Sequence, residues 1–387
     1  MKNKAIFFLF LSSIFCNAES LQFLSVQEFK ESITLSQNKK AFLDNYLRTI
    51  NELDSEVNSI IATYDSSEIY KAYVYGRNKE WQGVPIIIKD NIDSQGLPNT
   101  AGSLSMLDNF PRRDAHIVNR LKKAGFLVVG KANLSEWANF RGRNSVSGWS
   151  SFGGQTKNPY DLEFNPCGSS SGSAAAVALG LVPVSIGTET NGSITCPASI
   201  NGVVGIKPTV GLVSRHGIIP ISSTQDTAGP MARNVLDAAI VLKSISGRDP
   251  KDKATSNIPK NFDYSGLVRL NSGYLKGKRI GLIMPNDGDL EITFTLIRKA
   301  EKVFTEAGAQ IVPLKLKPLP NNFWASALFI LEHEFFIGLN DYLKKSRSSM
   351  RDMQSIVDFN NANKKDTMSF YGQESVSYTH LTLPTMD

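Results

Sequence analysis

The sequence predicts an α/β fold in which a central mixed β-sheet is covered by helices on both faces. The first observation is a pair of short, apolar, β-branched runs, VPIII at residues 84–88 and FLVV at 126–129, that suit buried strands. The second is a segment of helical periodicity between them, at residues 114–123. Strands that alternate with helices are typical of parallel or mixed sheets with a helical layer on each side.

A later part of the chain repeats this alternation. Apolar strand patterns at residues 278–283 and 310–314 flank a helical pattern at 293–307. We therefore expect a second β-α-β unit there.

The first element is expected to be a helical arm over residues 25–55. Ser25 and Glu28 have the spacing of a capping box, and apolar residues follow at loosely helical spacing. The polar residues 36–38 should interrupt the arm.

The middle of the chain contains the remaining elements that can be predicted. Residues 142–172 are rich in Gly, Ser, Asn and Pro and form a long irregular segment, which is typical of a functional loop. Around this loop we expect helices over 133–140 and 173–179, a strand over 182–186, and a helix and a strand within 194–206.

Residues 1–18 have the pattern of a removed export signal. Lys2 and Lys4 precede an almost unbroken apolar run, and small residues follow near Ala18. No other segment approaches the roughly 20 apolar residues that span a bilayer. The mature protein is therefore expected to be periplasmic or extracellular and free of the membrane.

The charge distribution does not indicate a nucleic-acid partner. The chain of 387 residues has a formal net charge of +6, from 42 Lys and Arg against 36 Asp and Glu. These charges are scattered, with no basic stripe and no interleaved aromatic residues. The surface is expected to be an ordinary solvated one, and the oligomeric state is left open.

Cys167 and Cys196 are the two cysteines that remain after signal removal. Two small buried thiols are the commoner outcome for such residues, although an oxidising compartment would allow them to pair. No Cys/His cluster has the spacing of zinc ligands, so neither a metal nor another cofactor is expected.

Two turns rich in Gly and Ser, at residues 168–173 and 190–193, stand at the edges of apolar elements. Small residues there allow backbone N–H groups to face a ligand, as acyl transfer requires beside a hydroxyl nucleophile. The run GSSSG at 168–172 also matches the G-x-S-x-G elbow, which would make Ser170 the nucleophile. Against that hypothesis, a polar segment interrupted by proline precedes the run where the elbow needs a buried strand.

Lys89 is the better candidate for a general base. It directly follows the apolar strand, where burial would lower the pKa of its ammonium group. Taken alone, a lysine at a strand end is more often an ordinary solvated residue.

The segment from 165 to 217, with GSSSG at 168–172 and GTETNGS at 187–193, resembles the amidase-signature family. So does PIIIKDNI at 85–92, and the resemblance extends over about residues 25–375. The family uses a Ser–cisSer–Lys triad in an amidase-signature α/β fold. The resemblance implies Lys89 as the base, Ser169 as the cis-serine and Ser193 as the acylated nucleophile.

The same resemblance implies the course of the reaction. Backbone N–H groups would hold the oxyanion, while the triad relays protons and an acyl-enzyme forms and is hydrolysed, releasing acid and ammonia. Those N–H groups are donated by Thr190, Asn191, Gly192 and Ser193.

Several departures from the general family pattern favour the peptide-amidase branch, which hydrolyses the C-terminal amide of peptides. Asn191 and Ser171 replace common glycines, and Glu189 replaces a common aspartate. A small or peptide amide is therefore the expected substrate. Walls of the substrate pocket are predicted within the long loop, from Trp149, Phe152 and Gln155.

The expected organisation is a signal at 1–18, an amidase-signature domain at 19–375 that is incomplete at its C-terminus, and an unrelated tail at 376–387. Such incompleteness would leave the sheet and the pocket unfinished. Two alternative functions stay open: a glutamine-hydrolysing amidotransferase subunit, which an export signal argues against, and a non-catalytic binding protein that retains the old pocket.

Overall fold

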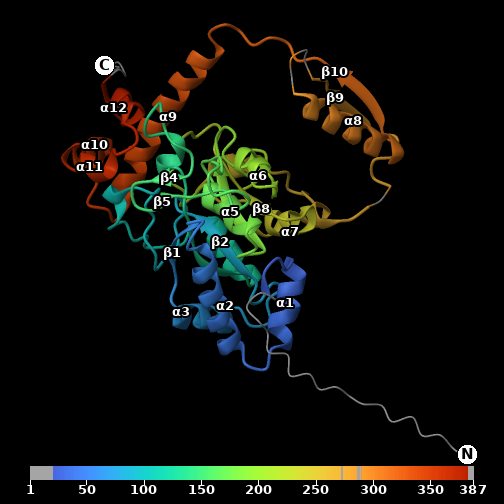
Figure 1. The fold of residues 1–387 in the computed structure, drawn as a ribbon, viewed down its shortest axis with the longest axis horizontal. Helices are drawn as coiled ribbons and strands as arrows, with labels where there is room; N and C mark the ends of the chain where they lie inside the picture. The colour runs from blue at the N-terminus through green and yellow to red at the C-terminus, as the bar shows by residue number, and fades with distance from the viewer. Residues whose placement is uncertain (1–20, 272, 286–287, 289, 382–387) are drawn as a thin grey trace, which may run out of the picture. The chain divides into compact units, whose positions relative to one another are not determined.

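The computed structural model describes residues 21–271, 273–285, 288 and 290–381 (Figure 1). The predicted signal and residues 382–387 of the predicted tail lie outside the described residues. The chain divides into two compact units. The larger unit consists of two segments, Met1–Tyr264 and Leu331–Asp387, and the smaller unit is Ser265–Ile330. No helix in the described ranges combines the length and apolarity needed to cross a membrane.

The larger unit contains a six-stranded mixed sheet in the order β1-β3-β2-β6-β8-β7. Its central strands β3, β2 and β6 are parallel, whereas β1, β8 and β7 pair antiparallel to their neighbours. The mixed sheet that the sequence predicts is therefore confirmed. The strands are β1 (Ile60–Thr63), β2 (Pro85–Lys89), β3 (Leu127–Ala132), β6 (Val184–Glu189), β7 (Val204–Gly205) and β8 (Thr227–Ala232).

Helices flank the sheet. The predicted arm is two helices, α1 and α2, and Ser25 and Glu28 form the capping box at its start. The helices of this unit are α1 (Val26–Leu35), α2 (Lys39–Asp54), α3 (Ser66–Tyr75), α4 (His116–Ala124), α5 (Ser171–Ala178), α6 (Thr195–Ile200), α7 (Val235–Ile245), α10 (Met353–Ala362), α11 (Lys364–Thr367) and α12 (Glu374–Leu381). Helix α9 (Phe323–Lys345) begins in the smaller unit and continues into this one.

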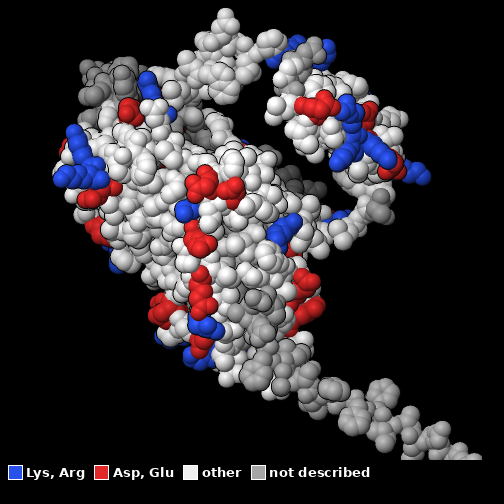
Figure 2. Space-filling view, in the orientation of Figure 1, with Lys and Arg blue, Asp and Glu red and all other residues white. Residues whose placement is uncertain are grey.

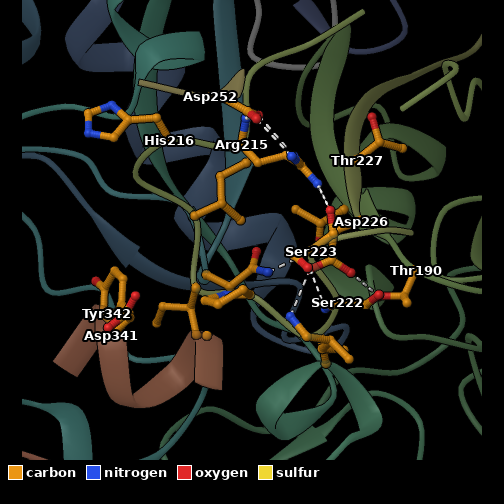
Figure 3. Close-up of a pocket in the computed structure, with 18 of the residues that line it drawn as sticks. Thr190, Arg215, His216, Ser222, Ser223, Asp226, Thr227, Asp252, Asp341 and Tyr342 are labelled. Atoms are coloured by element: carbon orange, nitrogen blue, oxygen red, sulfur yellow. Dashed lines mark hydrogen bonds and ion pairs between the residues drawn. The ribbon is translucent and has the colours of Figure 1, made fainter. Parts of the chain in front are cut away.

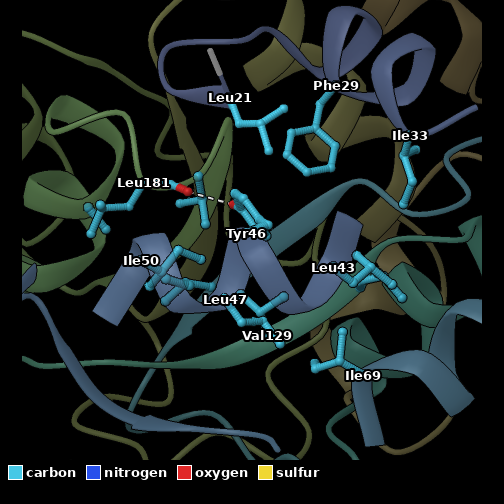
Figure 4. Packing of buried hydrophobic residues seen from close by; sticks show 14 of the residues in the cluster. Leu21, Phe29, Ile33, Leu43, Tyr46, Leu47, Ile50, Ile69, Val129 and Leu181 are labelled. Carbon is cyan, nitrogen blue, oxygen red and sulfur yellow. Dashed lines mark hydrogen bonds between the residues drawn. The ribbon is translucent and has the colours of Figure 1, made fainter. Parts of the chain in front are cut away.

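The main core lies between α1, α2, α3, α5 and one face of the sheet (Figure 4). Phe29 packs edge-on against Tyr46, whose hydroxyl donates to the carbonyl of Leu181 at 2.5 Å. Ile87 of β2 and Val129 of β3 belong to the same cluster. Because side chains alternate along a strand, Lys89 points to the same side as Ile87, toward α5.

The prediction of a helix over residues 133–140 is wrong. Only a short 3₁₀ turn, Glu136–Asn139, forms there, and Trp137 and Ala138 have φ values of 51° and 55°. That left-handed backbone cannot continue an α-helix. It places the N–H of Trp137 2.9 Å from the carbonyl of Ala101.

The smaller unit confirms the predicted β-α-β pattern. Strands β9 (Arg279–Ile283) and β10 (Gln310–Leu314) pair in parallel, and helix α8 (Glu291–Glu306) connects them.

Candidate active site

Lys89 is fully buried at the end of β2. Its Nζ lies 2.7 Å from Ser169 Oγ, 3.0 Å from Thr188 Oγ1 and 3.2 Å from the Thr188 carbonyl oxygen. Within the described part of the chain it has no carboxylate at ion-pair distance. Burial lowers the pKa of Lys89 to about 7, against smaller opposing effects of the Asp226 and Glu189 charges.

Ser169 lies in the tight turn that leads into α5. The peptide bond between Gly168 and Ser169 is cis, as the family resemblance implies. A side chain at Gly168 would place its Cβ only 2.3 Å from Ser135 Oγ, so the turn requires glycine. The turn therefore delivers a buried Ser169 hydroxyl to Lys89.

Ser193 lies in the second turn, between β6 and α6, and is 8% exposed. The Glu189 carboxylate holds this turn by accepting from the N–H groups of Ile194 at 2.6 Å and Thr195 at 2.9 Å. Within the described residues, no acceptor is found for the backbone N–H groups of residues 190–193. These four donors are free to bind an anionic oxygen.

The two turns are tied together at two places. The N–H of Ser170 donates to the carbonyl of Ser193 at 3.1 Å, and Cys167 is disulfide-bonded to Cys196, 29 residues later. The expectation of two free buried thiols is therefore wrong. The two turns lie side by side, and the sulfur atoms of Cys167, just before Ser169, and Cys196, just after Ser193, therefore meet.

The Ser169 and Ser193 hydroxyls do not hydrogen-bond to each other in the described structure. The proton transfer predicted from Ser193 to Ser169 is therefore not matched by a direct hydrogen bond. Ser170, the alternative nucleophile, is engaged elsewhere. Its hydroxyl donates to the carbonyl of Thr188 at 3.0 Å and accepts from the N–H of the same residue at 3.2 Å. Ser170 is also fully buried, so this geometry does not favour the elbow hypothesis.

A cavity of about 320 Å³ adjoins this region (Figure 3). It meets the site at Thr188, Glu189 and Thr190, and the apolar run at 218–221 contributes to its wall. Asp226 orders this side, because it accepts from Thr190 Oγ1 at 2.5 Å and from the N–H groups of Ile221 and Ser222. Burial raises the pKa of the Asp226 carboxyl.

Apart from Thr190, the residues that line the cavity were not predicted from the sequence. Asn91, two residues after Lys89, had an available signal, because it lies in the motif at 85–92. Arg215, which binds Asp252 at 2.7 Å, lies in the segment 165–217 that resembles the family but was not singled out. Asp226 comes from a segment without a distinctive pattern.

Trp149, Phe152 and Gln155, predicted as pocket walls, are not among the residues that line this cavity. Trp149 is buried and packs against Tyr371 with ring centroids 5.4 Å apart. It pairs with Gln155 across a two-stranded ribbon, β4 (Trp149–Ser150) and β5 (Gly154–Gln155). The N–H of Phe152 donates to the carbonyl of Gly102.

Other features bear on what could bind. No group of three or more His, Cys, Asp or Glu side chains suited to a metal ion is found among the described residues. Acidic and basic side chains are interspersed on the face of the molecule seen in Figure 2.

Comparison with known proteins places the chain in a family. The Amidase family profile matches residues 41–378. The structure of peptide amidase from Stenotrophomonas maltophilia is 43% identical, with a TM-score of 0.85 over 94% of this chain and 77% of that one. A probable amidase of Arabidopsis thaliana is 36% identical over 94% of this chain and 72% of its own length.

Other relatives belong to a different branch. A glutamyl-tRNA(Gln) amidotransferase subunit of Caldanaerobacter subterraneus is 38% identical over 76% of this chain and 60% of its own length. The chain spans between 40% and 72% of the length of the first three curated relatives that it matches. The family profile covers most of the chain, and the chain therefore belongs to the amidase family of the amidase-signature type, a family of hydrolases that act on amide C–N bonds.

Proposed function

We propose that this chain hydrolyses carboxamides, in particular the C-terminal amides of peptides, by a Ser–cisSer–Lys mechanism. The observation that supports this most strongly is the Lys89 amine, which is buried 2.7 Å from the Ser169 hydroxyl and has no carboxylate partner among the described residues. With a pKa of about 7, a large fraction of this amine is neutral at neutral pH and can accept a proton.

In the proposed reaction, Ser193 Oγ attacks the amide carbon as its proton passes to Ser169, whose own proton passes to Lys89. This transfer requires the Ser193 hydroxyl to come within hydrogen-bond reach of Ser169 when substrate binds. Catalytic contacts are often long before substrate arrives and shorten in the complex. The negative carbonyl oxygen would then be held by the free N–H groups of residues 190–193.

Collapse of the tetrahedral intermediate breaks the C–N bond, and the relay returns the proton to the leaving nitrogen, which departs as ammonia. Water then attacks the ester at Ser193, giving up its proton along the same relay. The products are a free carboxylic acid and the regenerated serine. No step needs a metal or another cofactor.

The preference for peptide amides is supported by the 43% identity with the peptide amidase of Stenotrophomonas maltophilia. It is also supported by the size of the cavity beside Thr190, about 320 Å³, which is at the lower end of small-molecule sites and suits one side chain or a short peptide end. The apolar residues 218–221 would contact the substrate side chain or peptide end that occupies the cavity.

Ammonia release tests this proposal. The full chain is incubated with C-terminally amidated dipeptides, with simple aliphatic amides and with free glutamine, and Ser193→Ala is the matched control. Release from the dipeptide amides that disappears in Ser193→Ala supports the proposal. Release from glutamine alone would favour the amidotransferase function. Binding of amides without turnover would indicate a binding protein.

We also propose that the mature chain is exported, on the basis of the pattern at residues 1–18. The Cys167–Cys196 disulfide supports this, because such bonds form and persist in oxidising compartments. Fractionation of cells followed by mass measurement of the mature N-terminus tests it. Protein that retains residues 1–18 in the cytoplasm would contradict it.

A further inference from the structure

Among the described residues, the Lys89 amine has three hydrogen bonds, and Thr188 makes two of them, although the proposed mechanism gives Thr188 no role. Its carbonyl oxygen lies 3.2 Å and its Oγ1 3.0 Å from Lys89 Nζ. Thr188 stands near the end of β6, and β6 is hydrogen-bonded in parallel to β2, the strand that ends at Lys89. The two strand ends therefore meet at the base.

The hydrogen-bonding capacity of these atoms restricts how the amine can be oriented. A neutral amine has two hydrogens and one lone pair, and the lysine carbon occupies its fourth position. A carbonyl oxygen can only accept, so the Thr188 carbonyl must take one hydrogen. If Thr188 Oγ1 accepts the second, the lone pair is left facing Ser169 Oγ, 2.7 Å away.

We propose that Thr188 is a positioning residue for the base: its carbonyl and hydroxyl oxygens accept the two hydrogens of neutral Lys89, and the nitrogen lone pair is thereby aimed at Ser169. This inference rests on the proposed function, in which Lys89 is the base. Thr188 acts through Lys89 and has no part in the reacting bonds.

The same three contacts serve both protonation states of Lys89. The ammonium form has three hydrogens for three acceptors: Ser169 Oγ, the Thr188 carbonyl and Thr188 Oγ1. When Lys89 loses its proton to Ser169, only the Lys89–Ser169 bond reverses its direction. The proton can therefore move back and forth without rearrangement of the buried surroundings, which is the preorganisation that efficient proton transfer needs.

Thr188 is itself fixed from two sides. The Ser170 hydroxyl bonds both its carbonyl oxygen and its N–H, at 3.0 and 3.2 Å. The side-chain amide of Asn91 lies 3.0 Å from Thr188 Oγ1, while the other polar atom of that amide, Oδ1, is buried with no partner in the described part of the chain. Exchanging the oxygen and nitrogen of the Asn91 amide would let Oδ1 accept the Thr188 hydroxyl hydrogen, which keeps the Oγ1 lone pairs for Lys89.

The test compares Thr188→Val, which keeps the shape and removes the hydroxyl, with Thr188→Ser, which keeps the hydroxyl. The readout is the rate at which a fluorophosphonate labels Ser193, measured between pH 5 and 10. In that reaction Ser193 Oγ bonds to phosphorus, fluoride leaves, and the serine proton passes through Ser169 to Lys89. Because no amide is involved, the result does not depend on the choice of substrate.

Thr188→Val is expected to lower the plateau rate at high pH about 10- to 100-fold, the scale of a misplaced catalytic group. The midpoint of the acid limb should also move to lower pH, because an acceptor that stabilises the Lys89 ammonium is gone. Asp226 and Glu189, the charges that act on Lys89, are unchanged in this variant. A larger neutral fraction of Lys89 combined with a slower labelling reaction indicates that the amine has lost its orientation. Thr188→Ser should restore both the plateau rate and the midpoint.

Ser185→Ala is the control for removing a buried hydroxyl from the same strand. Ser185 donates to the carbonyl of Ser173 in α5 at 2.7 Å, away from Lys89, so its rates should stay near wild type. An unchanged plateau in Thr188→Val would overturn the inference, as would a fall that Thr188→Ser shares or a fall without movement of the midpoint. Wild-type labelling without ammonia release from any amide would count against the proposed substrate but not against this inference.

Discussion

Replacing Lys89 by methionine is expected to stabilise the protein while it abolishes hydrolysis. The amine is fully buried, and its pKa falls from 10.5 to about 7 because burial penalises the charged form. The unfolded chain therefore binds the proton more tightly than the folded one. A lysine whose pKa is lowered by folding destabilises the fold fully below the folded pKa, and the cost disappears above the unfolded pKa.

The size of the effect follows from this shift. The cost is about 4 kcal/mol at pH 7 and about 1 kcal/mol at pH 10. Methionine removes this cost but leaves Ser169 Oγ without its partner, which costs about 1–3 kcal/mol at either pH. The variant should therefore gain about 1–3 kcal/mol at pH 7, and its advantage should shrink by about 3 kcal/mol at pH 10.

Urea unfolding at the two pH values, followed by tryptophan fluorescence, measures this. Lys131→Met is the matched control, because Lys131 is equally buried but pairs with Asp90 at 2.9 Å. Removing that partner leaves a buried carboxylate uncompensated and should destabilise by about 3–5 kcal/mol. A Lys89→Met variant that is less stable than wild type by the same amount at both pH values would refute the assignment of a depressed pKa to Lys89.

Three further predictions concern the serines, the pH profile and the disulfide. Ser193→Ala should fold normally and lose fluorophosphonate labelling. Ser170→Ala should keep labelling at Ser193 but lose about 1–3 kcal/mol in urea, since it removes the acceptor of the Thr188 N–H; peptide mapping that finds the label on Ser170 would contradict this. Ammonia release should fall as pH drops through about 7, where Lys89 gains its proton, and a rate that is flat from pH 5 to 8 would exclude a lysine base with that pKa. Replacing Cys167 and Cys196 together by alanine should cost about 3–4 kcal/mol from the loop-closure entropy of the 29-residue separation, and an unchanged melting temperature would show that the bond contributes nothing.

Much of the fold could be predicted because burial leaves a clear pattern in some elements. The apolar run before Lys89 is a strand buried along its whole length, and the Ala-rich segment after Ser170 is a buried helix. Strand β8 was not predicted, since its sequence TAGPMA contains Gly and Pro, which disfavour strands. It is a strand because β6 and β7 pair with it on either side.

The candidate site could be predicted only in part for a similar reason. Lys89, Ser169 and Ser193 lie in ordered motifs, and the contact between Lys89 and Ser169 agrees with their predicted roles, which stay proposals. Thr188 lies in the motif at 187–193, but its contact with Lys89 is with a residue 99 positions away, which the motif alone does not reveal. Asp226 lies in a segment without such a motif. The pairing of Cys167 with Cys196 likewise depends on how the two turns are folded together.

The covalent link between the two serine turns has a consequence for how the enzyme matures. A newly synthesised chain has its thiols reduced, and among the described residues the main-chain hydrogen bond that joins the two turns is then the one between Ser170 and Ser193. Oxidation of Cys167 and Cys196 then adds a covalent bond between the two turns. This part of the protein therefore reaches its final covalent connectivity only when these two thiols have been oxidised.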